Sequence, residues 1–213
     1  MTLRALSLAP DPALLQERVA AVLADGRQRL AAHFARPDLP PGHGAIPSDH
    51  ELVLRCLSTL RAQEPGLVRF LEWGSGLGIV AVAASRLGYD AHGIEWDEAM
   101  VAEARALAAR HGVRVPFVAG SFVPPGSDRL LDRAELSTRT VLQSDDAYDR
   151  LERDLDEFEV VFAYPWPEEE GLYRRLFDRH AGDGAVLVLY GQLDGVRAFR
   201  KVVERGRRGE RGR

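Results

Sequence analysis

An acidic residue followed by three glycines at alternate positions is the part of this sequence that points most directly to chemistry. Glu72 ends an apolar segment, and Gly74, Gly76 and Gly78 follow it, before the helix-forming run 79–81. Glycines let a backbone adopt positive φ and approach a ligand where a Cβ would clash. A helix that begins just after them directs unpaired N–H groups and a partial positive charge to the same place. The pattern therefore predicts a strand, a turn and a helix that hold a nucleotide-like ligand against the main chain.

The spacing of these glycines differs from that of a dinucleotide-binding turn. The G-x-G-x-x-G pattern would require a glycine at position 79, which is isoleucine. The acid and the three glycines instead resemble the first motif of class I S-adenosylmethionine (SAM) methyltransferases, and the resemblance extends over about residues 48–189. It implies that Glu72 helps to hold the amino group of the methionine moiety, and that the turn, Ser75 included, passes under the cofactor. The alternative is a turn that only tightens strand–helix packing.

The same resemblance assigns two further segments to the cofactor. Glu95 ends the next expected strand, where an acid implies bonds to both ribose hydroxyls, with Trp96 beside it against the adenine. The other reading of Glu95 is a solvated carboxylate. After the third expected strand, Gly120, Ser121 and Phe122 stand where many family members have an acid that bonds the adenine amino group. Ser121 can donate and accept a hydrogen bond, and Phe122 offers an apolar wall.

The fourth expected strand ends in aromatic residues and prolines. Tyr164, Pro165 and Trp166 occupy the position of the family's fourth motif, which faces the transferable methyl group. Methyltransferases that act on amino groups often have Asp or Asn, two prolines and an aromatic residue there, whereas this chain has Ala163 and Tyr164 at the first two positions. Two aromatic rings beside a sulfonium would stabilise its positive charge. The same rings between prolines could instead form only a rigid loop.

Methyl transfer requires little of a protein beyond alignment, because a sulfonium is already a strong electrophile. A general base is needed only for an acceptor that is protonated at the working pH, and the candidates are Tyr164, His50 and the run 168–170. The six histidines show no H-x-H or H-x-x-x-H pairing, so the sequence predicts no metal site.

Composition restricts the class of protein. A chain of 213 residues with 46% hydrophobic residues and a mean hydropathy of −0.20 fits one globular α/β domain with a modest extension. No apolar run approaches the roughly 20 residues of a membrane span, and the first residues lack a signal-peptide pattern. The single cysteine, Cys56, excludes internal disulfides and favours a cytoplasmic location. A net charge of −4 argues against non-specific binding to the phosphates of a nucleic acid.

Apolar periodicity predicts the elements that position these residues. A long amphipathic helix is expected before residue 35, and a second helix is expected from a capping box formed by Ser48 and Glu51. Strands and helices then alternate. The expected strands are 67–73, 91–95, 113–119, 159–164 and 185–190, with helices over 79–87, 98–110 and 168–179. This order predicts a Rossmann-like, doubly wound α/β fold with a mostly parallel sheet, helices on both faces and an N-terminal helical extension.

The pattern divides the chain into three regions. They are an N-terminal helical extension with a proline-rich loop (1–47), a SAM-binding domain (48–203) and a basic disordered tail (204–213). An insertion of about residues 124–157 separates the third and fourth expected strands. Few residues follow the last expected strand, so a shortened sheet edge is expected in place of a complete seven-stranded sheet. Residues 196–203 fit either one further strand or a short helix.

The sequence thus predicts a SAM-dependent methyltransferase whose acceptor is a small molecule or a protein side chain. The oligomeric state is left open, and neither a membrane nor a nucleic acid is expected as a partner. Two other classes also stay open at this point. One is a non-catalytic SAM-binding protein. The other is a nicotinamide-dependent oxidoreductase, against which Ile79 and the absence of any lysine before Lys201 both argue.

Overall fold

A computed structural model describes residues 3–10, 17–35, 48–131 and 143–202. Within them, seven strands form one sheet in the order β1-β7-β6-β5-β2-β3-β4. Five neighbouring strands run parallel to one another, namely β6, β5, β2, β3 and β4. The strand β7 is antiparallel to both of its neighbours, β1 and β6. Their bounds are β1 (Leu3–Leu6), β2 (Arg69–Trp73), β3 (Asp90–Glu95), β4 (Phe117–Ala119), β5 (Val160–Ala163), β6 (Val186–Gly191) and β7 (Gly195–Lys201).

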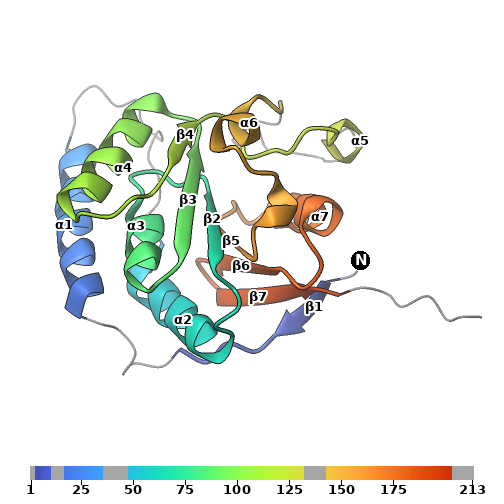
Figure 1. Cartoon of the computed structure of the whole chain (residues 1–213), viewed down its shortest axis with the longest axis horizontal. Coiled ribbons are helices and arrows are strands. Elements are labelled where there is room, and N and C mark those ends of the chain that lie inside the picture. The colour runs from blue at the N-terminus through green and yellow to red at the C-terminus, as the bar shows by residue number, and fades with distance from the viewer. Residues whose placement is uncertain (1–2, 11–16, 36–47, 132–142, 203–213) are drawn as a thin grey trace, which may run out of the picture.

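Helices cover both faces of this sheet, as Figure 1 shows. One face carries α1 (Glu17–Phe34), α2 (His50–Gln63), α3 (Ile79–Arg86) and α4 (Glu98–Arg110). The other face carries the short helices α5 (Asp128–Leu131) and α6 (Ala147–Leu151), a 3₁₀ turn (Leu155–Glu157) and α7 (Glu170–His180). Each face buries its own apolar cluster against the sheet. The predicted doubly wound α/β fold with an N-terminal helix is therefore confirmed.

The strand order places the candidate site. The order reverses between β2 and β5, and in open α/β sheets ligands bind outside the carboxyl ends of the strands at such a switch point. The glycine turn follows β2, and the turn 164–167 follows β5. Two segments separated by about ninety residues of sequence are thereby brought to one edge of the sheet.

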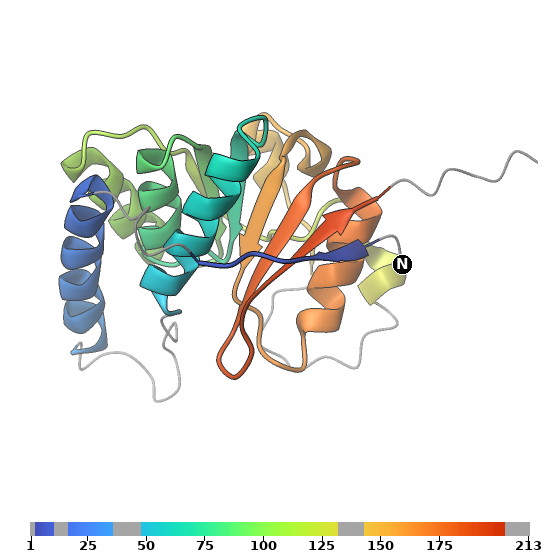
Figure 2. The same cartoon turned by 90° about the horizontal axis from the view of Figure 1, so that it is seen from below.

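The N-terminal strand corrects one expectation, that of a shortened sheet edge. Leu3 and Leu6 of β1 pair antiparallel with Lys201 and Ala198 of β7, so the start of the chain completes the seven-stranded sheet. Figure 2 shows β1 lying along β7 at the edge. Residues 196–201, which fitted a strand or a helix, belong to β7.

Other differences concern ends of elements. The N-cap of α2 is Asp49 rather than Ser48, and its carboxylate accepts a hydrogen bond from the Leu52 N–H at 3.0 Å. The cap of α4 is Asp97, whose carboxylate accepts hydrogen bonds from the N–H groups of Ala99 and Met100. The proline-rich loop at 36–47, part of the insertion at 132–142 and the tail at 203–213 lie outside the described residues.

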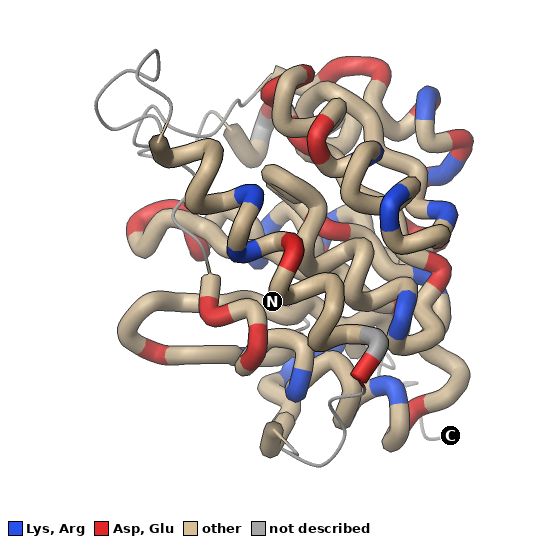
Figure 3. Tube along the Cα trace, turned by 90° about the vertical axis from the view of Figure 1, so that its left-hand side faces the viewer, with Lys and Arg blue, Asp and Glu red and all other residues tan. Residues whose placement is uncertain are grey.

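The described surface carries charges of both signs. On the face turned to the viewer in Figure 3, acidic and basic residues are interspersed, and neither forms a continuous stripe. Among the helices that the structure describes, none is both long and apolar enough to span a membrane.

The role of β1 leads to a stability prediction. Leu6 packs against the apolar cluster beneath the helices, whereas the neighbouring Ala5 is exposed. Leu6→Asp should lower the free energy of unfolding by about 2–3 kcal/mol, because it removes apolar burial and brings a charge to the core. That loss corresponds to about 5–10 °C in melting temperature. The matched control Ala5→Asp should change the free energy by less than about 0.5 kcal/mol. Equal melting temperatures for the two variants would mean that β1 does not close the sheet in solution.

Candidate active site

The glycine turn presents bare backbone to open space. Gly74 and Gly76 have φ values of 68° and 51°, in the left-handed region that favours glycine. A Cβ built on either residue would meet no heavy atom within 4 Å. A ligand can therefore approach the main chain at these two positions without a side chain in between.

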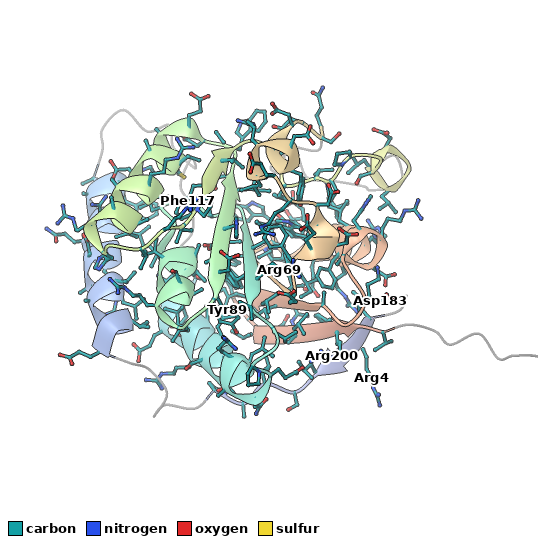
Figure 4. All side chains as sticks on the ribbon, in the orientation of Figure 1. Arg4, Arg69, Tyr89, Phe117, Asp183 and Arg200 are labelled. Carbon is teal, nitrogen blue, oxygen red and sulfur yellow. The ribbon has the colours of Figure 1, made fainter. Side chains whose placement is uncertain are left out.

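Gly78 differs from Gly74 and Gly76 in what surrounds its Cα atom. A Cβ at this position would lie 2.6 Å from Cζ of Phe117 and 2.7 Å from Cβ of Ala104. Phe117 extends from β4 on the side of the sheet that carries α4, and Figure 4 labels it. Gly78 thus allows α3 to pack closely against α4 and β4. Its missing side chain faces the core and not the open space beside Gly74.

Glu72 is buried at the end of β2 and acts as a cap for α3. Its Oε2 accepts a hydrogen bond of 2.8 Å from the N–H of Ala81, in the first turn of a helix whose own N-cap is a glycine. Burial raises the pKa of Glu72 well above its ordinary value, the Ala81 hydrogen bond opposes this rise, and the charge of Glu95 adds to it. The protein thus holds a carboxyl group where an anion is costly unless a cation lies nearby.

Glu95 reaches the same turn from the end of β3. Its Oε2 accepts a hydrogen bond of 2.7 Å from the Gly76 N–H, and its Oε1 accepts one of 3.1 Å from the Asp97 N–H. The structure therefore brings Glu72 and Glu95 together on the two sides of the turn. Trp96 is 58% exposed. It lines neither of the two cavities that lie at this edge of the sheet.

Ser75 adds an unsatisfied polar atom to the turn. Its backbone is fixed, because its N–H donates to the carbonyl of Ile94 at 2.9 Å and its carbonyl accepts from Gly78 at 2.7 Å. Its Oγ, however, is buried with no hydrogen-bond partner among the described residues. Since buried polar atoms in folded proteins almost always have a partner, this hydroxyl is available to a ligand.

The end of β4 is covered by a residue that the sequence pattern did not identify. Asp145 accepts hydrogen bonds from the Ser121 N–H at 2.8 Å and from the Ala147 N–H at 2.9 Å. A Cβ on Gly120 would lie 2.6 Å from the same carboxylate. The structure thus places the carboxylate of Asp145 beside Gly120 and Ser121, where the sequence has no acid directly after the strand.

Phe122 lies in the core. Its ring stacks on Trp73, with 5.2 Å between the ring centroids, and lies 4.9 Å from the ring of Tyr173. The structure therefore does not bring Phe122 to the glycine turn, and the apolar wall predicted from it is not present at the cavities described below.

Two adjoining cavities lie at the switch point. The smaller, about 70 Å³, is walled by the glycine turn, by Leu30 of α1 and by His50 of α2. The larger, about 590 Å³, is lined by the turn after β5 and by the β6–β7 hairpin. Gly74 and Tyr164 line both cavities. Only the larger of the two is within the ordinary range of ligand pockets.

The three predicted catalytic residues, Tyr164, Pro165 and Trp166, all line the larger cavity. The Tyr164 ring meets the Tyr190 ring edge to face, with 4.9 Å between centroids. Burial raises the pKa of Tyr164, which keeps the phenol protonated. Sequence reasoning missed the hairpin residues 190–194, because their approach to this turn depends on the pairing of β6 with β7.

The candidate bases lie around the two cavities: Tyr164 lines both, and Glu168 and Glu170 line the larger. His50 lines the smaller cavity, and burial lowers its pKa, so the imidazole is neutral at physiological pH. In the part of the chain that the structure describes, no group of three His, Cys, Asp or Glu side chains could hold a metal ion.

No family model matches the chain. The ribosomal protein L11 methyltransferase of Thermus thermophilus is 37% identical to it over 84 residues, which are 39% of this chain and 33% of that protein. The chain thus spans about a third of the length of this curated relative.

Solved methyltransferase structures resemble the chain in three dimensions. The RNA methyltransferase of Salinibacter ruber, in complex with S-adenosyl-L-homocysteine, is 22% identical with a TM-score of 0.48, covering 73% of this chain and 92% of that one. The O-methyltransferase of Bacillus cereus, also with S-adenosyl-L-homocysteine, is 18% identical with a TM-score of 0.47, covering 82% and 66%. The strand order and the two helical layers of this chain are themselves those of the class I, Rossmann-like fold.

The packing of Gly78 predicts a difference between two glycines of one turn. Gly78→Ala should lower the free energy of unfolding by about 2–4 kcal/mol, because the new Cβ would overlap Phe117 and Ala104 at a strained φ. Gly74→Ala should cost only about 1 kcal/mol, from strain alone. Urea denaturation of both variants measures the difference. Equal losses would show that Gly78 is not a packing residue.

Burial of Glu72 predicts a pH-dependent stability. Its raised pKa means that the folded protein binds this proton more tightly than the unfolded chain does, so stability falls as pH rises above the ordinary glutamate value of 4.5. Glu72→Gln keeps the shape without the charge. Without ligand it should melt at the same temperature as the natural protein near that pH, and at a higher one at pH 8. The exposed control Glu98→Gln should show no such divergence. A Glu72→Gln protein that melts lower at pH 8 would mean that the carboxylate stabilises the free fold.

Proposed function

We propose that this chain is a SAM-dependent methyltransferase. The observation that carries the proposal is the bare backbone of Gly74 and Gly76, which lies between the carboxylates of Glu72 and Glu95 and faces open space. From Gly74 this space continues past Tyr164 into the larger cavity. A cofactor seated on the turn would thus point its reactive end toward a second, roomier compartment.

The charges at the turn favour SAM over a nicotinamide dinucleotide. Helix N-termini ordinarily bind phosphate through their free N–H groups. Here Glu72 and Glu95 accept hydrogen bonds from Ala81 and Gly76, and a pyrophosphate at this place would meet two carboxylates. SAM carries a sulfonium and an ammonium group, and both are attracted to these acids.

The residues present fit the parts of SAM. We assign the cofactor's ammonium group to Glu72 and the ribose hydroxyls to Glu95, and Ser75 offers a hydroxyl that has no partner of its own among the described residues. Asp145 is the acid placed to accept from an adenine amino group. When bound, the cofactor supplies an electrophilic methyl group. The protein's part is to align the acceptor in the cavity beside Tyr164 and to exclude water.

We further propose that the acceptor is a small molecule or a protein side chain. The curated relative is named for a protein acceptor, and the net charge of −4 disfavours a nucleic acid.

We propose a cytoplasmic location from the state of the single cysteine. Cys56 is a buried free thiol, and burial raises its pKa to about 11. A free thiol of this kind suits a reducing cytoplasm.

Substitution of Glu95 tests the assignment at the ribose. Glu95→Ala should weaken SAM binding about ten- to a hundredfold, because it removes charge-assisted hydrogen bonds worth about 1.5–3 kcal/mol. Titration calorimetry measures the affinity, with Glu98→Gln as the control at an exposed acid of the neighbouring helix. Unchanged affinity in Glu95→Ala would remove this acid from the site.

The proposal as a whole is tested by comparing ligands. Calorimetry with SAM, S-adenosyl-L-homocysteine and NAD should show binding of the first two only. Transfer of a labelled methyl group then separates an enzyme from a non-catalytic binding protein. Binding of NAD without SAM would overturn the proposal.

A further inference from the structure

The larger cavity has an aromatic wall. Tyr164 and Trp166 come from the turn after β5, and Tyr190 comes from the end of β6. The edge-to-face contact between the two tyrosines holds their rings in place. Aromatic faces attract cations through their quadrupole, most strongly where water is excluded. The wall therefore suits a positively charged or positively polarised group.

The charged groups of this cavity have a negative balance. Three carboxylates line it, from Glu168, Glu170 and Asp194, against the single guanidinium of Arg197. Arg197 is ion-paired with Glu170, and its Nη2 lies 3.3 Å from Oδ2 of Asp194. Its charge is thus already compensated within the wall. Glu168 is exposed and forms no ion pair with any residue of the described segments.

We propose that the acceptor is a primary amine, held in this cavity by the aromatic wall and by Glu168 and Asp194. This inference rests on the proposed methyltransferase function and adds the substrate class. An anionic acceptor would meet the carboxylate of Glu168, which no cation of the described residues pairs with. An ammonium group would find carboxylate acceptors at the rim and ring faces inside.

Methyl transfer to this acceptor requires a neutral amine. The bound ammonium group loses one proton to solvent through the open rim. The lone pair of the neutral amine then forms a bond to the methyl carbon of SAM while the carbon–sulfur bond breaks, and the electron pair of that bond stays on sulfur. The sulfur becomes a neutral thioether, and the positive charge passes to the methylated nitrogen, where the carboxylates and rings stabilise it.

Labelled methyl transfer by the full chain tests the class of acceptor. The probes are spermidine, a lysine-containing peptide with a blocked N-terminus, the same peptide with acetylated lysines, catechol and dithiothreitol. We expect methylation of an amine and none of the acetylated peptide. Methylation of spermidine alone would indicate that the acceptor is a free, small-molecule amine. Methylation of the peptide alone would indicate that the acceptor is a protein side chain. SAM binding with methylation only of catechol or dithiothreitol, or of no amine, overturns this inference but not SAM binding. Absence of SAM binding overturns the proposed function as well.

Substitution of Glu168 tests the binding mode. Glu168→Gln should raise KM for the amine about five- to tenfold and leave kcat and the SAM affinity nearly unchanged, because this exposed acid lines the larger cavity and not the smaller one at the glycine turn. The matched control is Asp183→Asn, which removes one charge at the opposite end of β6, where Figure 4 labels Asp183. Glu168→Asp should restore most of the lost affinity. An equal rise of KM in Asp183→Asn would show that only the net charge of the protein matters.

Discussion

The site depends on how the backbone N–H groups between residues 76 and 81 are satisfied. Two of them donate to carboxylates that come from neighbouring strands, Gly76 to Glu95 and Ala81 to Glu72. Because these acids bind the turn from two strands, the turn needs no side chains of its own to stay folded. Gly74 and Gly76 can then leave their exposed side bare. A ligand surface made of main chain is possible only with this support.

The N-terminal strand bears on the second compartment as well as on stability. The strand β7 follows β6 directly through a short hairpin, and β1 pairs with its other side. The residues of that hairpin, 191–194, form one wall of the larger cavity, and Arg197 ties the wall to α7 through Glu170. The strand β1 thus pairs with β7, which belongs to the hairpin that lines the larger cavity. The pairing of β1 with β7 keeps the hairpin from being a free edge.

Local patterns in the sequence were enough to predict the turn and the parallel strands, because each depends on residues close together in the chain. Non-local features were not predictable in this way. Four residues, Leu3–Leu6, carry too little periodicity to mark a strand that pairs with residues near 200. Asp145 reaches Ser121 across an insertion, and Gly78 meets Phe117 from another strand. Both contacts come from tertiary packing, so a motif read along the chain did not reveal the packing of Gly78 and missed Asp145.

The buried carboxyl of Glu72 links binding to stability. In the free protein the fold must bury this group, which favours the protonated form and costs stability at neutral pH. A cationic ligand on the turn would relieve that cost, because the carboxylate then has an opposite charge within the same low-dielectric space. A ligand that binds only the folded state stabilises it by mass action. Relief of this cost of burying the Glu72 carboxylate would therefore contribute to the affinity for a cation. An anionic cofactor at this turn would increase the same cost.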